Sequence, residues 1–112
     1  MNERIRYILG HMLYDILDVI EFTKEIESVE EFAENRLCRK AVVMSILNIG
    51  ELAKRLPEDF KLATSEIPWK KIIGMRDIAA HGYHVMEDEI IWDVARNSIP
   101  LLGKQLEALL YI

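Results

Sequence analysis

Apolar residues recur every three or four positions through most of this chain, which is the spacing of amphipathic helices. The first such stretch extends from about Asn2 to Lys24. A second begins at the capping-box sequence Ser28–Glu31 and ends at about Arg55, because the residue before Pro57 is disfavoured in a helix. The apolar positions that define the two stretches are Ile5, Leu9, Met12, Ile16, Ile20, Phe32, Leu37, Ala41, Met44, Leu47 and Leu52. We therefore expect two long helices in the first half of the chain.

The second half shows the same spacing, interrupted by turn signals. A short helical turn is expected over residues 58–63, and Ile67-Pro68-Trp69 begins a longer helix that ends at His81-Gly82. Asp88 is the expected N-cap of a last helix, in which Pro100 should produce a kink by removing one backbone hydrogen bond. No stretch alternates as a strand does. The sequence therefore predicts an all-α fold, an antiparallel bundle of four to five helices, in one domain covering residues 1–112.

The composition is that of a globular domain in a reducing compartment. Of 112 residues, 51% are hydrophobic and 29% are charged, and Cys38 is the single cysteine, so no internal disulfide can form. The longest uncharged stretch, residues 41–50, has about half the length that a membrane span requires. Glu3, Arg4 and Arg6 near the start do not fit a signal peptide. We expect a cytoplasmic protein with no membrane association.

Charge is distributed unevenly along the chain, although the whole sequence carries a net charge of −5. Residues 1–35 have a net charge of −6 and residues 82–112 a net charge of −3, whereas residues 36–81 have a net charge of +4. The acidic total argues against a protein that coats nucleic acid without regard to sequence. The basic middle third is where we expect an anionic ligand to bind.

Four side chains capable of chemistry gather at the end of the helix that begins near Trp69, namely Arg76, Asp77, His81 and Tyr83. An arginine fork matches two phosphate oxygens and can stabilise the extra negative charge of a pentacoordinate phosphorane. A histidine titrates near neutral pH, so it can remove the proton of an RNA 2′-hydroxyl or protonate a leaving 5′-oxygen. Asp77 can orient either group. Such a reaction requires neither a metal nor a cofactor.

Other candidate chemistry is poorly supported by the sequence. One cysteine and three histidines give no standard zinc site, and the five glycines form no phosphate-binding loop. Glu51 is an acid in an otherwise apolar stretch, and it either orients Arg76 or His81 or faces solvent. A stripe of polar and aromatic residues on the first helix is interpreted as an interface. Its histidine, His11, is not expected to be catalytic. This stripe consists of Tyr7, His11, Tyr14 and Asp18. Trp69 and Trp92 are expected to anchor the core or an interface.

The spacing of Arg76 and His81 poses a geometric problem. Positions five apart on an ideal helix differ by about 140° around the axis, so the two residues do not share one face. Either the helix terminus turns His81 back, or a second chain completes the site. We favour the second alternative, a symmetric homodimer in which both motifs face one cleft.

The pattern Arg76-x4-His81-x-Tyr83 resembles the signature of HepT-type toxins, members of the HEPN superfamily of helical ribonucleases. The resemblance covers nearly the whole chain and extends to Ile49-Gly50-Glu51-Leu52-Ala53, Ile67-Pro68-Trp69, Ile91-Trp92 and Ile99-Pro100. It implies an all-helical homodimer with its cleft at the subunit interface and metal-independent cleavage of RNA. Arg76 and His81 would be the catalytic pair, and Asp77 conforms to a position that is commonly Asn or Asp.

The resemblance also implies a partner protein and a type II toxin–antitoxin system. HepT-type toxins are encoded beside a minimal nucleotidyltransferase antitoxin, which transfers AMP from ATP to the tyrosine of the motif, here Tyr83. The added bulk and negative charge, two residues from His81, would block RNA. Ordinary roles are the alternative for these side chains: Arg76 and Asp77 in a solvated helix face, and Tyr83 covering the core. The alternative function is a non-catalytic helical binding module that docks the nucleotidyltransferase.

Overall fold

The structure is a computed structural model that describes the backbone of residues 1–82 and 87–111 and the side chains of residues 1–77 and 87–111. All regular secondary structure in these ranges is helical, so the predicted all-α fold is confirmed. None of the helices in this part of the chain combines the length and the apolar character that crossing a membrane requires.

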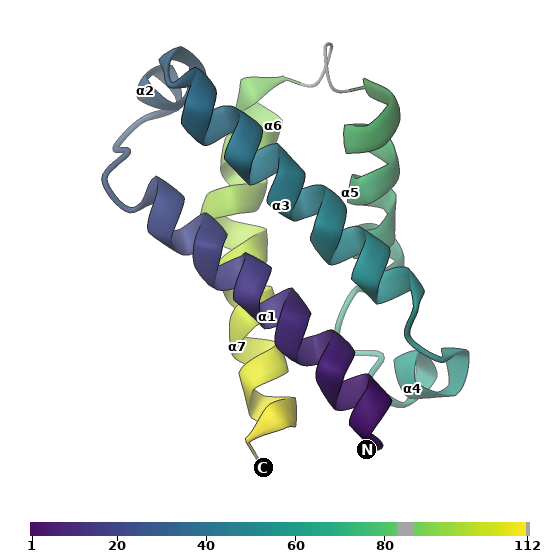
Figure 1. Cartoon of the computed structure of the whole chain (residues 1–112). Helices are drawn as coiled ribbons and strands as arrows, with labels where there is room; N and C mark the ends of the chain where they lie inside the picture. Colours follow the sequence, from purple (N-terminus) through teal and green to yellow (C-terminus); the bar gives the residue numbers. More distant parts are fainter. Residues whose placement is uncertain (83–86, 112) are drawn as a thin grey trace.

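Long helices form an antiparallel bundle, and short helices connect them (Figure 1). The long helices are α1 (Glu3–Thr23), α3 (Arg36–Lys54), α5 (Trp69–Gly82) and α7 (Ile99–Leu110). The short ones are α2 (Val29–Glu34), α4 (Glu58–Ala63) and α6 (Asp88–Asp93), and the π-helical segment Val94–Ser98 joins α6 to α7. α3 contacts both α1 and α5, and α1 also contacts α7. The predicted bundle of four main helices is therefore present, with α3 and α1 at its centre.

The core lies where the faces of these helices meet. α1 contributes four of its five predicted apolar positions, Ile5, Leu9, Met12 and Ile16, whereas Ile20 is exposed. The buried face of each of the other long helices packs against this face or against α3. Burial of apolar surface is the main favourable contribution to folding, about 25 cal/mol per Å². α5 packs on α3, α3 packs on α1, and α1 packs on α7. This order determines which helix faces stay at the surface, where a ligand can bind.

The second predicted helix is in fact two helices, divided at Asn35. The backbone of Asn35 leaves the helical region (φ −92°, ψ 85°), and its Oδ1 accepts a hydrogen bond of 3.0 Å from the Cys38 amide, which starts α3. The capping box begins α2 as predicted, because Ser28 Oγ accepts from the Glu31 amide at 3.2 Å. The return bond differs: the Glu31 carboxylate accepts from the amide of Glu27 at 3.1 Å instead of the amide of Ser28.

The predicted core face of α3 is also wrong in part, since Leu37 is 81% exposed and Met44 is exposed. This helix carries two apolar stripes at helical spacing, and periodicity alone does not distinguish them. The stripe that faces the core contains Cys38, Val42, Val43, Ile46, Ile49 and Ala53. Its small and β-branched side chains suit a helix packed on two sides. The second stripe is left at the surface.

The last helical region begins one residue earlier than predicted, and its proline lies at the start of a helix that follows a π-helical segment. Glu87, and not Asp88, is the N-cap of α6, and no side chain caps it. The Asp88 carboxylate instead accepts a hydrogen bond from Nε of Arg39 on α3. Pro100 lies in the first turn of α7, directly after the π-helical turns of residues 94–98. The wider turn accommodates the missing backbone donor of the proline.

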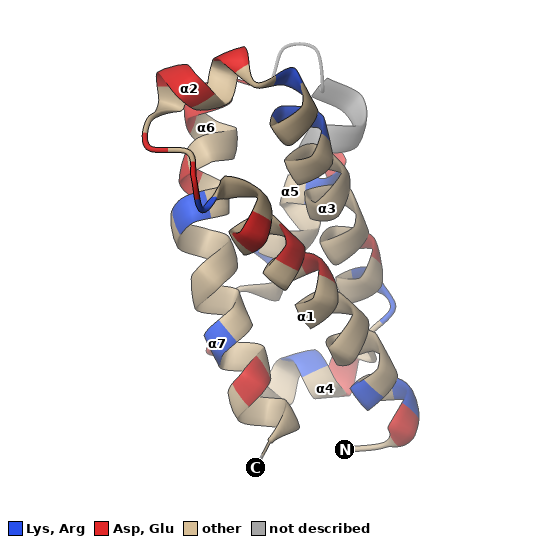
Figure 2. Ribbon diagram, turned by 60° about the vertical axis from the view of Figure 1, so that its left-hand side comes forward, with Lys and Arg blue, Asp and Glu red and all other residues tan. Residues whose placement is uncertain are grey.

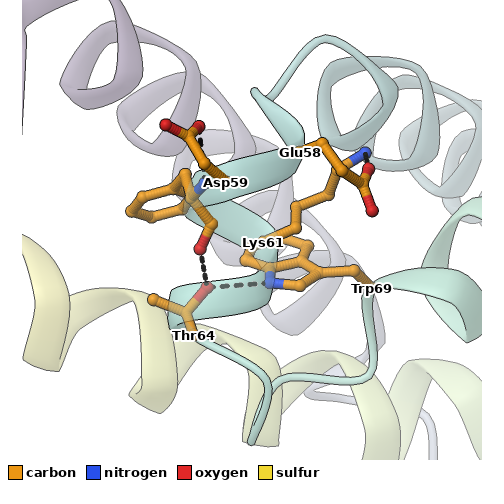
Figure 3. A network of polar contacts seen from close by, with 6 residues as sticks. Glu58, Asp59, Lys61, Thr64 and Trp69 are labelled. Carbon is orange, nitrogen blue, oxygen red and sulfur yellow. Dashed lines mark hydrogen bonds and ion pairs between the residues drawn. The ribbon is translucent and has the colours of Figure 1, made fainter.

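Trp69 anchors the turn between α4 and α5 (Figure 3). Its indole Nε1 donates to Thr64 Oγ1 at 3.0 Å, and this hydroxyl donates in turn to the Phe60 carbonyl at 2.8 Å. Trp69 and Thr64 are both buried, and the rings of Phe60 and Trp69 lie 6.2 Å apart. The predicted role of Trp69 as an anchor is confirmed. This network fixes the start of α5, the helix that carries the motif.

Candidate active site

Arg76 projects from α5 against α3, where two carboxylates hold its guanidinium. Nε donates to Glu51 Oε2 at 3.0 Å, and Nη1 donates to Asp77 Oδ1 at 3.0 Å. The Arg76 side chain is 28% exposed, whereas that of Asp77 is 56% exposed. The structure therefore brings together three of the predicted site residues, one from α3 and two from α5. Glu51 contacts Arg76, as one of the predicted alternatives has it, and its side chain is also 44% exposed to solvent.

Gly50 allows this contact, because it lets α5 approach the backbone of α3 closely. A β-carbon added to Gly50 would overlap Cβ of Arg76 and lie 3.0 Å from its Cγ and 3.3 Å from its Cα. Only the hydrogen atom of glycine fits in this space. The Arg76 stem thus packs on the helix turn that also carries Glu51, and the two side chains meet without reaching across a gap.

Electrostatics at Arg76 favour the charged guanidinium. The hydrogen bond to Asp77 raises the pKa of Arg76 above its ordinary value, and the negative charge of Glu51 adds to this effect. Arg76 is therefore a permanent cation with a fixed orientation. One cation faces two carboxylates, so an incoming anion competes with Asp77 for the Nη1 end of the guanidinium. The more exposed partner, Asp77, is the one that solvent and ligands reach first.

The other two motif residues lie at or beyond the edge of the described part of the chain. The backbone of α5 is helical through Gly82, so positions 76 and 81 are about 140° apart around the helix axis. The side chain of His81 and the whole of Tyr83 fall outside the described residues. Within the described part of the chain, no three His, Cys, Asp or Glu side chains are close enough to hold a metal ion.

The basic residues in the middle third of the sequence lie on several helices. Exposed Arg36 and Lys40 are at the start of α3, and exposed Lys54 and Arg55 are at its other end, with Arg76 against the face between them. Figure 2 shows these basic ends of α3 and the acidic residues on α1 and α2. Lys61 is on α4 and Lys70 and Lys71 are on α5, so the cations of the basic segment are spread over three helices.

A pocket that the sequence did not reveal lies between α1 and α3. Its lining includes Tyr7 and His11 of the predicted stripe, together with Asp15, Asn48 and Glu51. The rings of Tyr7 and His11 have centroids 4.3 Å apart. A signal was present, since positions 7, 11 and 15 repeat every four residues and share one helix face. Their facing residues on α3 depend on how the helices cross, which periodicity does not give.

Comparison with known proteins relates this helical bundle to a family of ribonucleases. The chain matches the family model described as Ribonuclease HepT-like over residues 12–109. It is 36% identical to "Putative RNase MJ1380" of Methanocaldococcus jannaschii, over 85% of this chain and 90% of that protein. It is 39% identical to "Putative RNase TTE0752" of Caldanaerobacter subterraneus subsp. tengcongensis, over 94% of this chain and 93% of that protein.

A further relative is "Probable ribonuclease HepT" of Thermococcus cleftensis, 36% identical over 87% of this chain and 91% of that protein. No solved structure is significantly similar to the chain. The family model covers most of the sequence, and the chain therefore belongs to the HepT-like family of HEPN ribonucleases. The family and the enzyme class predicted from the sequence are confirmed.

Two glycine substitutions test the close contact of α3 and α5. Gly50→Ala should lower the free energy of unfolding by about 1–3 kcal/mol, because the added methyl group overlaps Arg76. Gly74→Ala, on α5 where an added β-carbon meets nothing within 4 Å, should raise it by roughly 0.5–1 kcal/mol. Urea unfolding followed by circular dichroism measures both. Equal stabilisation by the two substitutions would show that α3 and α5 do not touch at Gly50.

Proposed function

We propose that the protein is a metal-independent endoribonuclease and the toxin of a type II toxin–antitoxin system, acting in the cytoplasm. The observation that carries the proposal is the arginine fork of Arg76, held in one orientation by Glu51 from a different helix. A guanidinium fixed at Nε keeps its remaining N–H groups for a ligand, and their planar spacing matches two phosphate oxygens. Membership of the HepT-like ribonuclease family supports RNA as the substrate.

Each site residue has a role in this reaction. Arg76 stabilises the dianionic phosphorane, and Glu51 positions it. Asp77, the exposed partner of Arg76, gives way when the phosphate binds. His81 removes the proton of the 2′-hydroxyl, whose oxygen then attacks the adjacent phosphorus, and a protonated histidine donates to the departing 5′-oxygen. General acid–base catalysis and charge stabilisation together supply this mechanism, so it needs no metal.

The proposed protein is a symmetric homodimer, and two observations support this. The backbone of α5 is helical through Gly82, so positions 76 and 81 are about 140° apart around its axis, and a second chain would bring one residue of each kind together. The surface of α1 and α3 also leaves large apolar side chains exposed. Examples are Tyr14, Leu17, Leu37 and Met44. A second copy of the chain would bury them and face the two motifs toward each other.

The regulatory partner in this proposal is a minimal nucleotidyltransferase that transfers AMP to Tyr83. Formation of a phosphodiester bond to the tyrosine oxygen, with release of pyrophosphate from ATP, adds a negative charge close to His81. That charge repels the phosphates of RNA and the nucleotide occupies their space. The competing function, a helical module that only docks the nucleotidyltransferase, would bind the same partner but leave RNA intact.

Cleavage of a single-stranded RNA in excess EDTA tests the proposed activity. The wild-type protein should cleave it, and Arg76→Ala and His81→Ala should each lower the rate by about 100-fold or more. Lys104→Ala, which removes an exposed cation of α7, is the control and should leave the rate unchanged. Equal cleavage by wild type and His81→Ala would assign the activity to a contaminating nuclease.

Mixing the two inactive variants shows whether the site is shared between chains. After joint refolding, a heterodimer of Arg76→Ala and His81→Ala contains one intact pair if each site takes one residue from each chain. Cleavage should then reappear in the mixture. If each chain carried its own complete site, every site in the mixture would lack a residue and no activity would return.

Tyr83 is tested by co-expression with the nucleotidyltransferase encoded beside this chain. The intact mass of the wild-type protein should increase by one or more AMP units, and the modified protein should no longer cleave RNA. Tyr83→Phe should keep its unmodified mass and its activity, because it lacks the acceptor oxygen. A Tyr83→Phe protein that gains AMP would move the acceptor to another residue.

A further inference from the structure

The pocket between α1 and α3 opens directly beside the candidate active site. Its volume is about 380 Å³, within the range of roughly 300–1,000 Å³ that is usual for small-molecule sites. Glu51 lines this pocket and also accepts the Nε–H of Arg76 at 3.0 Å. A group bound in the pocket is therefore a neighbour of whatever the guanidinium binds.

One side of the pocket is aromatic. Tyr7 and His11 lie one turn apart on α1, with ring centroids 4.3 Å apart and planes inclined by 49°. The side chain of Tyr7 is 65% exposed, and His11 is exposed as well. Exposed aromatic rings beside a nucleic-acid site provide surfaces on which unpaired bases stack, and every base can use them.

The other side of the pocket presents carboxylates. Asp15 is half-buried and lines the pocket together with Asn48 of α3. Burial raises the pKa of Asp15, and Asp18 adds to this, while Asn48 and His11 oppose it. Asp15 and Glu51 together repel phosphate, so the chemistry of the pocket admits a base and not the backbone of a nucleic acid.

We propose that this pocket binds one unpaired base of the RNA next to the cleaved phosphate, and that it prefers guanine. The inference rests on the proposed ribonuclease function. Guanine presents two adjacent donors, N1–H and the N2 amino group, which match the two oxygens of one carboxylate. Adenine and cytosine present one amino group to the same acceptors. Uracil presents a single N–H between two carbonyl oxygens, which a carboxylate repels.

The neighbouring phosphate has a partner at the rim. Arg55 lines the mouth of the pocket and is exposed at the end of α3, outside the pair of carboxylates. It can contact the phosphate on one side of the bound nucleotide, while Arg76 meets the phosphate on the other side. The two arginines and the pocket together define a path for about one nucleotide of single-stranded RNA along α3.

Binding of uncleavable RNA measures the base preference directly. The probes are fluorescein-labelled 2′-O-methyl pentanucleotides, with uracil at four positions and guanine, adenine, cytosine or uracil at the centre. The 2′-O-methyl group removes the nucleophile, so binding is measured without cleavage. Fluorescence anisotropy should show the guanine probe binding about 10-fold or more tightly than the uracil probe, with adenine and cytosine between them.

Matched variants connect this preference to the pocket. Asp15→Asn should abolish the preference for guanine, because an amide replaces one of two acceptor oxygens with a donor. Asp18→Asn, on the same helix but outside the pocket, should keep it. Tyr7→Ala should lower the affinity for all four probes by similar factors. Tyr7→Phe should bind them as tightly as the wild type, because the ring is retained. Burial disfavours the charge of Asp15, so Asp15→Asn is expected to fold, which circular dichroism verifies.

The outcomes separate this inference from the proposed function. RNA cleavage that depends on His81, with equal binding of the four probes by wild type, overturns the base pocket and leaves the ribonuclease in place. A loss of preference in Asp18→Asn as large as that in Asp15→Asn also overturns it. Preference for guanine that requires Asp15, in a protein that cleaves no RNA, supports the pocket and rejects the catalytic proposal.

Discussion

The arrangement of the site depends on the contact between α3 and α5 at Gly50. Without a side chain at this position, the Arg76 stem packs directly against the α3 backbone. The next residue of α3, Glu51, then meets the guanidinium at 3.0 Å although it lies 25 positions earlier in the sequence. Any larger residue at position 50 would push the two helices apart. The orientation of the motif arginine is therefore a property of helix packing and not of α5 alone.

Local sequence signals predicted the parts of the fold that depend on neighbouring residues. The capping box at Ser28, the stop before Pro57 and the end of α5 at Gly82 all lie where the chain itself specifies them. Two features required tertiary information. Asn35 was not recognised as a break, because the apolar spacing continues through it, and the core face of α3 could not be chosen between two stripes of similar spacing.

For the candidate site too, the sequence predicted some of the residues but not how they meet. The motif residues Arg76 and Asp77 were identified by type and spacing, and Glu51 only as one of two possibilities. The structure pairs Glu51 with Arg76 because the crossing of α3 and α5 determines which residues meet. The same reason explains why the pocket of Asp15 and Asn48 was missed, since its two walls come from α1 and α3. Residues that share a helix face can be found from sequence, whereas residues that share a cavity depend on how helices cross.

The distribution of charge is the second constraint on the candidate site. The cations of residues 36–81 lie at both ends of α3 and on α4 and α5, and one of them, Arg76, is bonded to two carboxylates. One chain thus offers an oriented arginine without a strongly positive surface around it. In the proposed homodimer, a second set of cations and a second histidine would supply the remaining positive charge. The acidic total then restricts binding to a small region, which suits a nuclease that acts on particular RNA sites.

In the proposed reaction, Arg76 and His81 cleave RNA through attack by its own 2′-hydroxyl. The most direct test is mass spectrometry of the ends produced when the purified protein cuts a defined single-stranded RNA in excess EDTA. Attack by the 2′-oxygen with departure of the 5′-oxygen predicts a 2′,3′-cyclic phosphate on one fragment and a 5′-hydroxyl on the other. Attack of water with loss of the 3′-oxygen would instead leave a 5′-phosphate and a 3′-hydroxyl. Fragments with these ends would contradict attack by the 2′-hydroxyl.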